Sequence, residues 1–236
     1  LWACPVCWLL EHRLAGPAVG NASQHFGTVI HHVAQLASEE GLDLPTWKAE
    51  VPVPERIEAV TERMMELYRQ ERGGLEEDAD VAEQYRAVRN DAEAEHTLAN
   101  IASYFVLSNT DDYLGANAKK FEVGRLERVR CEVPFEAHID LHGILAACQG
   151  AEGLALMTLD DLYGIMGALV GGWPEGMDPD LRIRLSGRID RLETRLSSDG
   201  VRRLRIIDYK SGASKPTVKH MLNDLQLVCY QLGLRF

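Results

Sequence analysis

One stretch of the sequence decides the fold: LRIRLSGRID, residues 181–190. Apolar residues alternate with polar ones along it, and Gly187 takes one of the apolar positions. Successive side chains of a strand point to opposite faces, so this alternation predicts a half-buried β-strand. Asp190 ends the polar face of that strand.

A second strand and a helix are predicted directly downstream. Residues 203–210 read RLRIIDYK, and the connection SSDG at residues 197–200 is typical of a hairpin. A helix is expected after Pro216, where apolar residues return at helical spacing. A further strand is expected over Val123–Ile139, where Pro134 either argues against a strand or places it at a sheet edge. Together these elements predict an α/β core in residues 121–236.

The first 120 residues are predicted to be mostly helical. Apolar residues recur there at helical spacing. Two helices are expected first, over residues 2–14 and 23–41, the second with Ser23 as N-cap and Gly41 as the stop. A linker at Pro52 and Pro54 leads to a third helix over 55–72, which Gly73-Gly74 ends. A fourth is expected over 81–107. Residues 140–180 give the weakest pattern, with one helix expected over 159–170. We expect a single domain over residues 1–236.

Length and composition exclude some classes of protein. The 236 residues suffice for a full core, and no run of 18 apolar residues suggests a membrane span. The opening residues Leu1-Trp2 do not begin a basic and then apolar leader, so no signal peptide is expected. Five scattered cysteines indicate a reducing compartment, and we expect a cytoplasmic protein.

The distribution of charge points to one face that contacts phosphate. The net charge is −11, but residues 181–220 hold 11 Lys/Arg against 4 Asp/Glu. This region therefore carries +7 and the rest of the sequence −18. A basic belt on an acidic body is compatible with DNA binding by one face, and also with a solvated strand face.

Two aspartates and a lysine form the strongest chemical pattern. Asp208 and Lys210 are two residues apart at the end of the second predicted strand, so they should project to one side. The hairpin can bring Asp190 beside Asp208. Two adjacent carboxylates repel unless a cation lies between them, and carboxylate oxygens suit Mg²⁺ or Mn²⁺.

Such a site suits phosphodiester hydrolysis. A divalent metal polarises the phosphoryl oxygen and lowers the pKa of bound water. Lys210 would supply a compact positive charge that offsets charge on the pentacoordinate phosphate. An exposed salt bridge between Asp208 and Lys210 is the alternative reading of these two residues alone.

Five blocks, in order along the chain, resemble the RecB-type branch of the PD-(D/E)XK nuclease superfamily. The blocks are Cys4-Pro5, Gly27-Thr28-Val29-Ile30-His31, Gly187-Arg188-Ile189-Asp190-Arg191, Ile207-Asp208-Tyr209-Lys210-Ser211-Gly212 and Gln226-Leu227-Val228-Cys229-Tyr230. The resemblance implies a restriction-endonuclease-like α/β fold, in which a mixed sheet with flanking helices follows an N-terminal helical lobe. Glu132, before Pro134-Phe135, also resembles a glutamate of the family, although this match is looser.

The resemblance also implies a role for each matching residue. His31, Asp190 and Asp208 would bind Mg²⁺ or Mn²⁺ together with the Tyr209 carbonyl. Lys210 would be the catalytic lysine. Gln226 and Tyr230, one helical turn apart, would line the active site or touch DNA. His32 follows His31, but the spacing from Gly27 favours His31 as the ligand.

The cysteines and the length of residues 140–180 need comment beside the family pattern. Some members hold an iron–sulfur cluster with one early and three late cysteines, but Cys229 is the only late cysteine here, so no such cluster is expected. Cys4 and Cys7 form a C-x-x-C without a second metal-binding pair, which favours packing over a zinc site. The stretch of residues 140–180 is long for the family, and could be a DNA guide, a partner contact or a loose insertion.

The leading interpretation is a metal-dependent exodeoxyribonuclease. The resemblance implies a nuclease module of a helicase–nuclease that acts in double-strand break repair and recombination, with DNA and a helicase as partners. The chain has no G-x-x-x-x-G-K-[ST] loop, so the motor would lie elsewhere. The alternatives are a catalytically silent DNA-binding or scaffold module, and a stand-alone nuclease that trims DNA for CRISPR adaptation.

Overall fold

The computed structural model describes residues 22–76, 91–117, 123–150, 153–169, 171–173, 182–210 and 225–235. The chain divides into two compact units, Leu1–Phe121 with Lys210–Ser214, and Glu122–Tyr209 with Lys215–Phe236. The first predicted helix and the Cys4-x-x-Cys7 motif lie outside the described residues. The expectation of a single domain stays a prediction.

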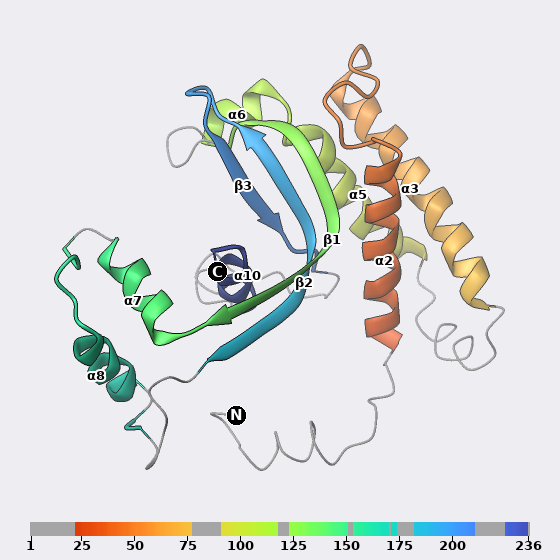
Figure 1. Cartoon of the computed structure of the whole chain (residues 1–236). Helices are drawn as coiled ribbons and strands as arrows, with labels where there is room; N and C mark the ends of the chain where they lie inside the picture. The colour runs from red at the N-terminus through yellow and green to blue at the C-terminus, as the bar shows by residue number, and fades with distance from the viewer. Residues whose placement is uncertain are drawn as a thin grey trace. The chain divides into compact units, whose positions relative to one another are not determined.

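The first unit is helical (Figure 1). Its described helices are α2 (Ala22–Glu39), α3 (Val53–Glu76), α5 (Asp91–Leu107) and α6 (Asp111–Asn117). α3 packs against both α2 and α5. The residues of the predicted apolar stripe on α2 are all buried, namely Phe26, Val29, Ile30, Val33 and Ala37. The helical period of this segment therefore predicts its core face correctly.

The boundaries of α2 correct one predicted cap. The helix begins at Ala22, so Ser23 lies inside it and is not the N-cap. The predicted stop is confirmed, because the helix ends at Glu39 and Gly41 follows with φ 76°. Glycine adopts this left-handed conformation without a steric penalty, which is why it ends helices.

α3 is longer than predicted at both ends. Val53 and Pro54 form its first turn, so Pro54 belongs to the helix and not to a linker. A proline in the first turn loses no helical hydrogen bond, which explains why it starts the helix here. The helix also continues through Gly73 and Gly74 to Glu76, so the predicted end was wrong. Of the long helix predicted over 81–107, the described part is α5.

The second unit contains a three-stranded sheet in the order β1-β2-β3 (Figure 1). Its strands are β1 (Arg125–Ile139), β2 (Ile183–Leu196) and β3 (Arg202–Ile207), and both pairings are antiparallel. A mixed α/β architecture was predicted and is observed, although the described strands include no parallel pair. β1 lies at the sheet edge, as Pro134 indicated, since proline cannot donate to a ladder.

α10 (Leu225–Arg235) covers one face of this sheet and closes the core of the unit. Ile189, Leu192 and Tyr230 form the buried centre, and Phe135 packs against it. The Phe135 ring also lies against two glycines: a Cβ at Gly187 would be 2.8 Å, and one at Gly233 2.2 Å, from its ring carbons. Both glycines therefore make room for the ring. Of the helix predicted after Pro216, residues 225–235 are described.

The stretch between β1 and β2 forms two helices that pack together, α7 (Leu141–Gln149) and α8 (Leu159–Leu169). α8 matches the predicted helix, whereas α7 was not predicted. Its local signal is Asp140, whose carboxylate accepts a 2.7 Å hydrogen bond from the Gly143 amide and caps the helix. Among the described helices of either unit, none combines the length and the apolar composition that a membrane crossing needs.

Candidate active site

Asp190 lies where the ladder between β2 and β3 ends. The last paired residues are Arg191 and Ile207, so Asp190 and Asp208 each lie one position beyond the ladder. The Tyr209 amide donates a 2.8 Å hydrogen bond to Asp190 Oδ2. This bond fixes the orientation of the Asp190 carboxylate. The hairpin thus brings Asp190 to the chain segment that carries Asp208 and Tyr209.

β3 ends at Ile207, earlier than predicted. Asp208, Tyr209 and Lys210 therefore follow the strand, and strand geometry does not decide which way their side chains point. The Asp208 side chain is half-buried and Lys210 is exposed. The predicted roles of Asp208 as a ligand, of the Tyr209 carbonyl and of Lys210 as the catalytic lysine remain predictions.

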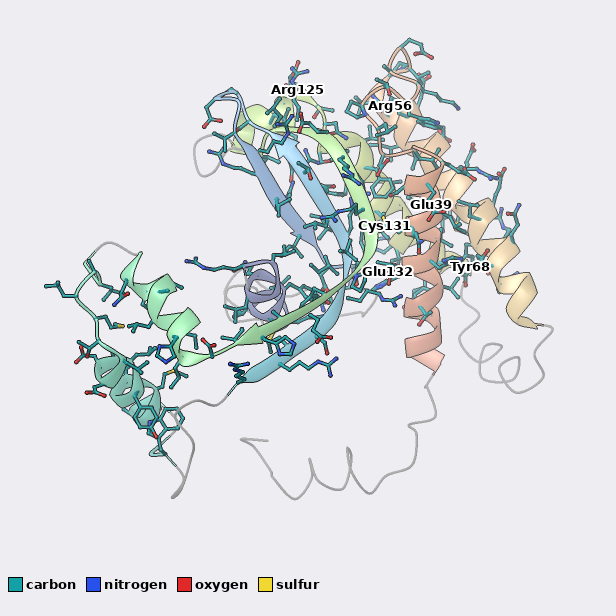
Figure 2. All side chains as sticks on the ribbon, viewed as in Figure 1. Glu39, Arg56, Tyr68, Arg125, Cys131 and Glu132 are labelled. Carbon is teal, nitrogen blue, oxygen red and sulfur yellow. The ribbon has the colours of Figure 1, made fainter. Side chains whose placement is uncertain are left out.

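Glu132 is the residue that the sequence analysis undervalued. It lies on β1 between Cys131, which pairs with Arg191, and Val133, which pairs with Ile189 (Figure 2). This register sets Glu132 opposite Asp190, and oxygens of the two carboxylates lie within 4.8 Å. In the sequence Glu132 has only its loose family match, because its position opposite Asp190 depends on the register between two strands that are distant in the chain.

The regular alternation of β1 and β2 is interrupted at this pair. Glu132 has φ 50°, a left-handed conformation that costs free energy in a residue other than glycine. On β2, Ile189 and Leu192 are three positions apart yet both pack in the core with Tyr230. A regular strand cannot place both on one face, so the alternation shifts between them, at Asp190 and Arg191. Such irregularities often re-aim side chains beside active sites.

The Glu132–Asp190 pair suits a divalent cation. Two carboxylates at this separation repel each other, and the repulsion is relieved when a cation binds both. Carboxylate oxygens are hard ligands, which Mg²⁺ and Mn²⁺ prefer. Among the described residues of this unit, Asp208 is not part of the same close group. The sequence suggested Asp208 as the carboxylate beside Asp190, whereas the structure sets Glu132 in this close group.

His31 belongs to α2 in the helical unit and is half-buried. It lies one helical turn after Gly27, as the block G-x-x-x-H requires. The neighbouring His32 contacts α3, where its Nε2 atom is 3.4 Å from a Glu71 carboxylate oxygen. The preference for His31 over His32 still rests on the spacing from Gly27, and the role of His31 remains a prediction.

Gln226 and Tyr230 share a face of α10, as their spacing predicts. Gln226 Nε2 donates a 2.6 Å hydrogen bond to the Tyr230 hydroxyl. The Tyr230 ring is 6% exposed and meets the Phe135 ring edge-on, with centroids 5.8 Å apart. The contacts of Tyr230 are thus those of a core residue. The expected contact of these two residues with DNA remains a prediction.

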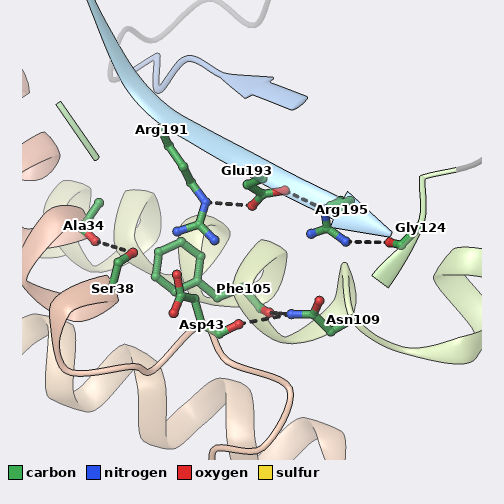
Figure 3. A network of polar contacts seen from close by, with 9 residues as sticks. All are labelled: Ala34, Ser38, Asp43, Phe105, Asn109, Gly124, Arg191, Glu193 and Arg195. Atoms are coloured by element: carbon green, nitrogen blue, oxygen red, sulfur yellow. Dashed lines mark hydrogen bonds and ion pairs between the residues drawn. The ribbon is translucent and has the colours of Figure 1, made fainter. Parts of the chain in front are cut away.

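A buried ionic triad on β2 follows Asp190 (Figure 3). Glu193 accepts hydrogen bonds from Arg191 Nε at 2.7 Å and Arg195 Nε at 2.6 Å, and all three side chains are at most 1% exposed. Arg195 Nη1 also donates to the Gly124 carbonyl. Burial opposes ionisation of Glu193, but the two guanidiniums outweigh burial and hold the pKa of this carboxyl below its ordinary value. The triad fixes β2 just beyond the site.

One of three comparisons with known proteins found a match. The family model of the PD-(D/E)XK nuclease superfamily matches residues 1–235. A search of curated proteins and a search of solved structures gave no match.

Proposed function

Because this chain belongs to the PD-(D/E)XK nuclease superfamily, we propose that it is a metal-dependent deoxyribonuclease that hydrolyses DNA at Asp190. The observation that carries the proposal is the carboxylate pair of Glu132 and Asp190, with the Tyr209 amide holding Asp190 in place. A structural ion pair would join opposite charges. Two like charges side by side indicate a site for a cation.

The residues would divide the work as follows. Glu132 and Asp190 would hold Mg²⁺ or Mn²⁺, with Asp208, the Tyr209 carbonyl and His31 as the further expected ligands. The bound metal supplies Lewis-acid activation of the phosphate and of a water molecule. Lys210 would offset negative charge on the reacting phosphate. Gln226 would contribute from α10, with Tyr230 supporting its position through the hydrogen bond between them.

The first experiment compares the unaltered protein with Lys210→Ala on end-labelled linear DNA. With Mg²⁺ or Mn²⁺ the unaltered protein should degrade the DNA, and Lys210→Ala should lower the rate more than about 100-fold, the scale seen when one charge-stabilising group is lost. Lys48→Ala, on the exposed loop between α2 and α3, is the matched control and should keep full activity. Equal rates for the unaltered protein and Lys210→Ala would refute this placement of the active site.

The finer description of the activity belongs to the same proposal. We expect an exonuclease that acts on DNA ends, with a helicase domain or subunit as partner, in double-strand break repair and recombination in the cytoplasm. The support is the ordered set of blocks from Cys4-Pro5 to Gln226–Tyr230.

A catalytically silent DNA-binding module is the second candidate. The basic residues of 181–220 favour DNA contact in either case. The two candidates differ in their need for a cation, because a silent module should bind DNA equally well with EDTA and with Mg²⁺. The Glu132–Asp190 pair argues for the enzyme, since a bound cation relieves the repulsion between two carboxylates at this separation.

A further inference from the structure

The exposed side of β2 carries a row of polar residues that ends at Asp190. In the regular part of the strand, alternate residues share one face. Counting back from Asp190, these are Arg188, Ser186 and Arg184, and Arg182 follows just before the strand begins. The Arg188 and Arg184 side chains are 64% and 63% exposed. On the opposite face Ile189 lies in the packed core and Gly187 lies beside the Phe135 ring.

We propose that Arg184 and Arg188 bind backbone phosphates of the DNA strand whose scissile bond lies at Asp190. The proposal rests on the nuclease function proposed above and assigns its substrate path. The two arginines lie four positions apart along the strand, a distance of about 13 Å. That distance corresponds to about four nucleotides of B-form DNA. Guanidinium groups recognise phosphate oxygens through paired hydrogen bonds, so arginine suits this role.

Each arginine now contacts a carboxylate of β1 that a phosphate can replace. Arg184 Nη2 is 2.7 Å from Glu136, which His138 Nε2 also contacts at 3.0 Å. Arg188 Nη1 is 3.7 Å from Glu132. Exposed ion pairs of this kind contribute little to stability, so exchanging a carboxylate for a phosphate has a small cost. The pairs also hold both guanidiniums beside β1 before DNA arrives.

The contact of Arg188 with Glu132 links DNA binding to the metal site. The Glu132 carboxylate contacts the Arg188 guanidinium and lies within 4.8 Å of the Asp190 carboxylate. Its negative charge can therefore attract either Arg188 or a bound divalent cation. When Glu132 and Asp190 share a divalent cation, the attraction of Glu132 for Arg188 weakens, and Arg188 can turn to a phosphate. Arg184 contacts Glu136, not Glu132, so its phosphate contact should not depend on the cation.

The test measures binding of a fluorescent single-stranded oligonucleotide by anisotropy over a range of salt concentrations, with Ca²⁺ as the divalent cation. Arg184→Gln and Arg188→Gln should each weaken binding about fivefold and lower the slope of log K against log salt by about 0.7. Arg63→Gln is the matched control. Arg63 also contacts a carboxylate, Glu40, at 2.6 Å, but it lies on α3, outside the basic residues 181–220.

Several outcomes overturn the proposal. Unchanged affinity and slope in both row variants, or an equal loss in the Arg63→Gln control, would show that the row does not bind phosphate. Ca²⁺ should raise the affinity of the unaltered protein and of Arg184→Gln by the same factor, and of Arg188→Gln by less; equal gains would refute the link to the metal site. If Mg²⁺-dependent cutting occurs while the row variants bind normally, only the row fails. If the unaltered protein neither binds nor cuts, the nuclease proposal fails with it.

Discussion

At the scale of single residues, Asp190 combines a structural bond with a destabilising charge. Its Oδ2 atom accepts from the Tyr209 amide, and its charge faces that of Glu132. Asp190→Asn keeps an oxygen that can accept from Tyr209 but removes the repulsion. We expect cleavage to fall more than about 100-fold, while Tm in EDTA stays level or rises by about 2 °C.

Thermal unfolding with and without Mg²⁺ checks this prediction. A ligand that binds only the folded state raises Tm, so Mg²⁺ should stabilise the unaltered protein and not Asp190→Asn. Asp199→Asn, in the exposed β2–β3 hairpin, is the control and should keep the Mg²⁺ response. A fall in Tm of Asp190→Asn in EDTA would show that the site carboxylates do not repel each other.

Glu193 makes stability depend on pH. Its pKa is lowered in the folded protein by Arg191 and Arg195, against the effect of burial. A lowered folded pKa means that Glu193 contributes stability above its unfolded pKa of about 4.3, and that this contribution is lost as pH falls through the folded pKa. Glu193→Gln should therefore cost about 3 kcal/mol at pH 7, because it leaves two buried guanidiniums without their carboxylate.

Urea unfolding at pH 7 and at successively lower pH measures the effect. The gap between Glu193→Gln and the unaltered protein should narrow below about pH 4. Glu127→Gln removes a carboxylate from the more exposed pair with Arg202 and should change stability little. A gap of constant size at every pH would show that the charge of Glu193 contributes nothing.

At the scale of elements, Gly187 allows β2 to pack beside Phe135. A Cβ at position 187 would lie 2.8 Å from Phe135 Cε1, so Gly187→Ala should destabilise the protein by about 1–3 kcal/mol. Adding Phe135→Leu should recover part of this loss. Gly164→Ala in α8 meets no atom within 4 Å and should be neutral or stabilising, since alanine is the better helix former. Chemical denaturation of the four proteins decides the matter, and a neutral Gly187→Ala would show that Phe135 moves aside without cost.

The elements also show why only part of the structure could be predicted. Alternation predicted β2 because one face of that strand is packed and the other exposed, and helical spacing predicted the buried stripe of α2. α7 was missed because its nine residues are too few for a clear period. The passage of α3 through Gly73-Gly74 was missed because glycine lowers helix propensity without excluding a helix, and the residue types of 203–210 do not mark where β3 ends.

The residue types expected at the candidate site stay predictions, and the sequence does not predict that Glu132 pairs with Asp190. The hairpin predicted from the sequence already implies that Asp190 and Tyr209 lie close together, as their hydrogen bond shows. The opposition of Glu132 and Asp190 required the register of β1 against β2, which spans more than fifty residues of sequence. A local pattern carries no information on such a pairing until both strands are aligned. The shift in alternation at Asp190 could not be predicted from the spacing of apolar residues, because that spacing assumes a regular strand.

At the scale of the whole molecule, the charge distribution favours a narrow contact with DNA. Residues 181–220 carry +7 and the rest of the chain −18, so DNA phosphates are attracted to the basic stretch and repelled by the remainder. A strand end brings fewer phosphates near that acidic remainder than a duplex that continues in both directions. We therefore expect Mg²⁺-dependent degradation of linear DNA and sparing of covalently closed circles of the same sequence. Raised salt screens both the attraction and the repulsion. It should slow the cutting of linear DNA, because the expected contacts between basic residues and phosphates are shorter in range than the repulsion from the acidic residues. Time courses on both substrates, with a circle linearised at one site as the control, measure this directly. Equal cutting of closed circles would assign the activity to an endonuclease and would leave the metal site as proposed.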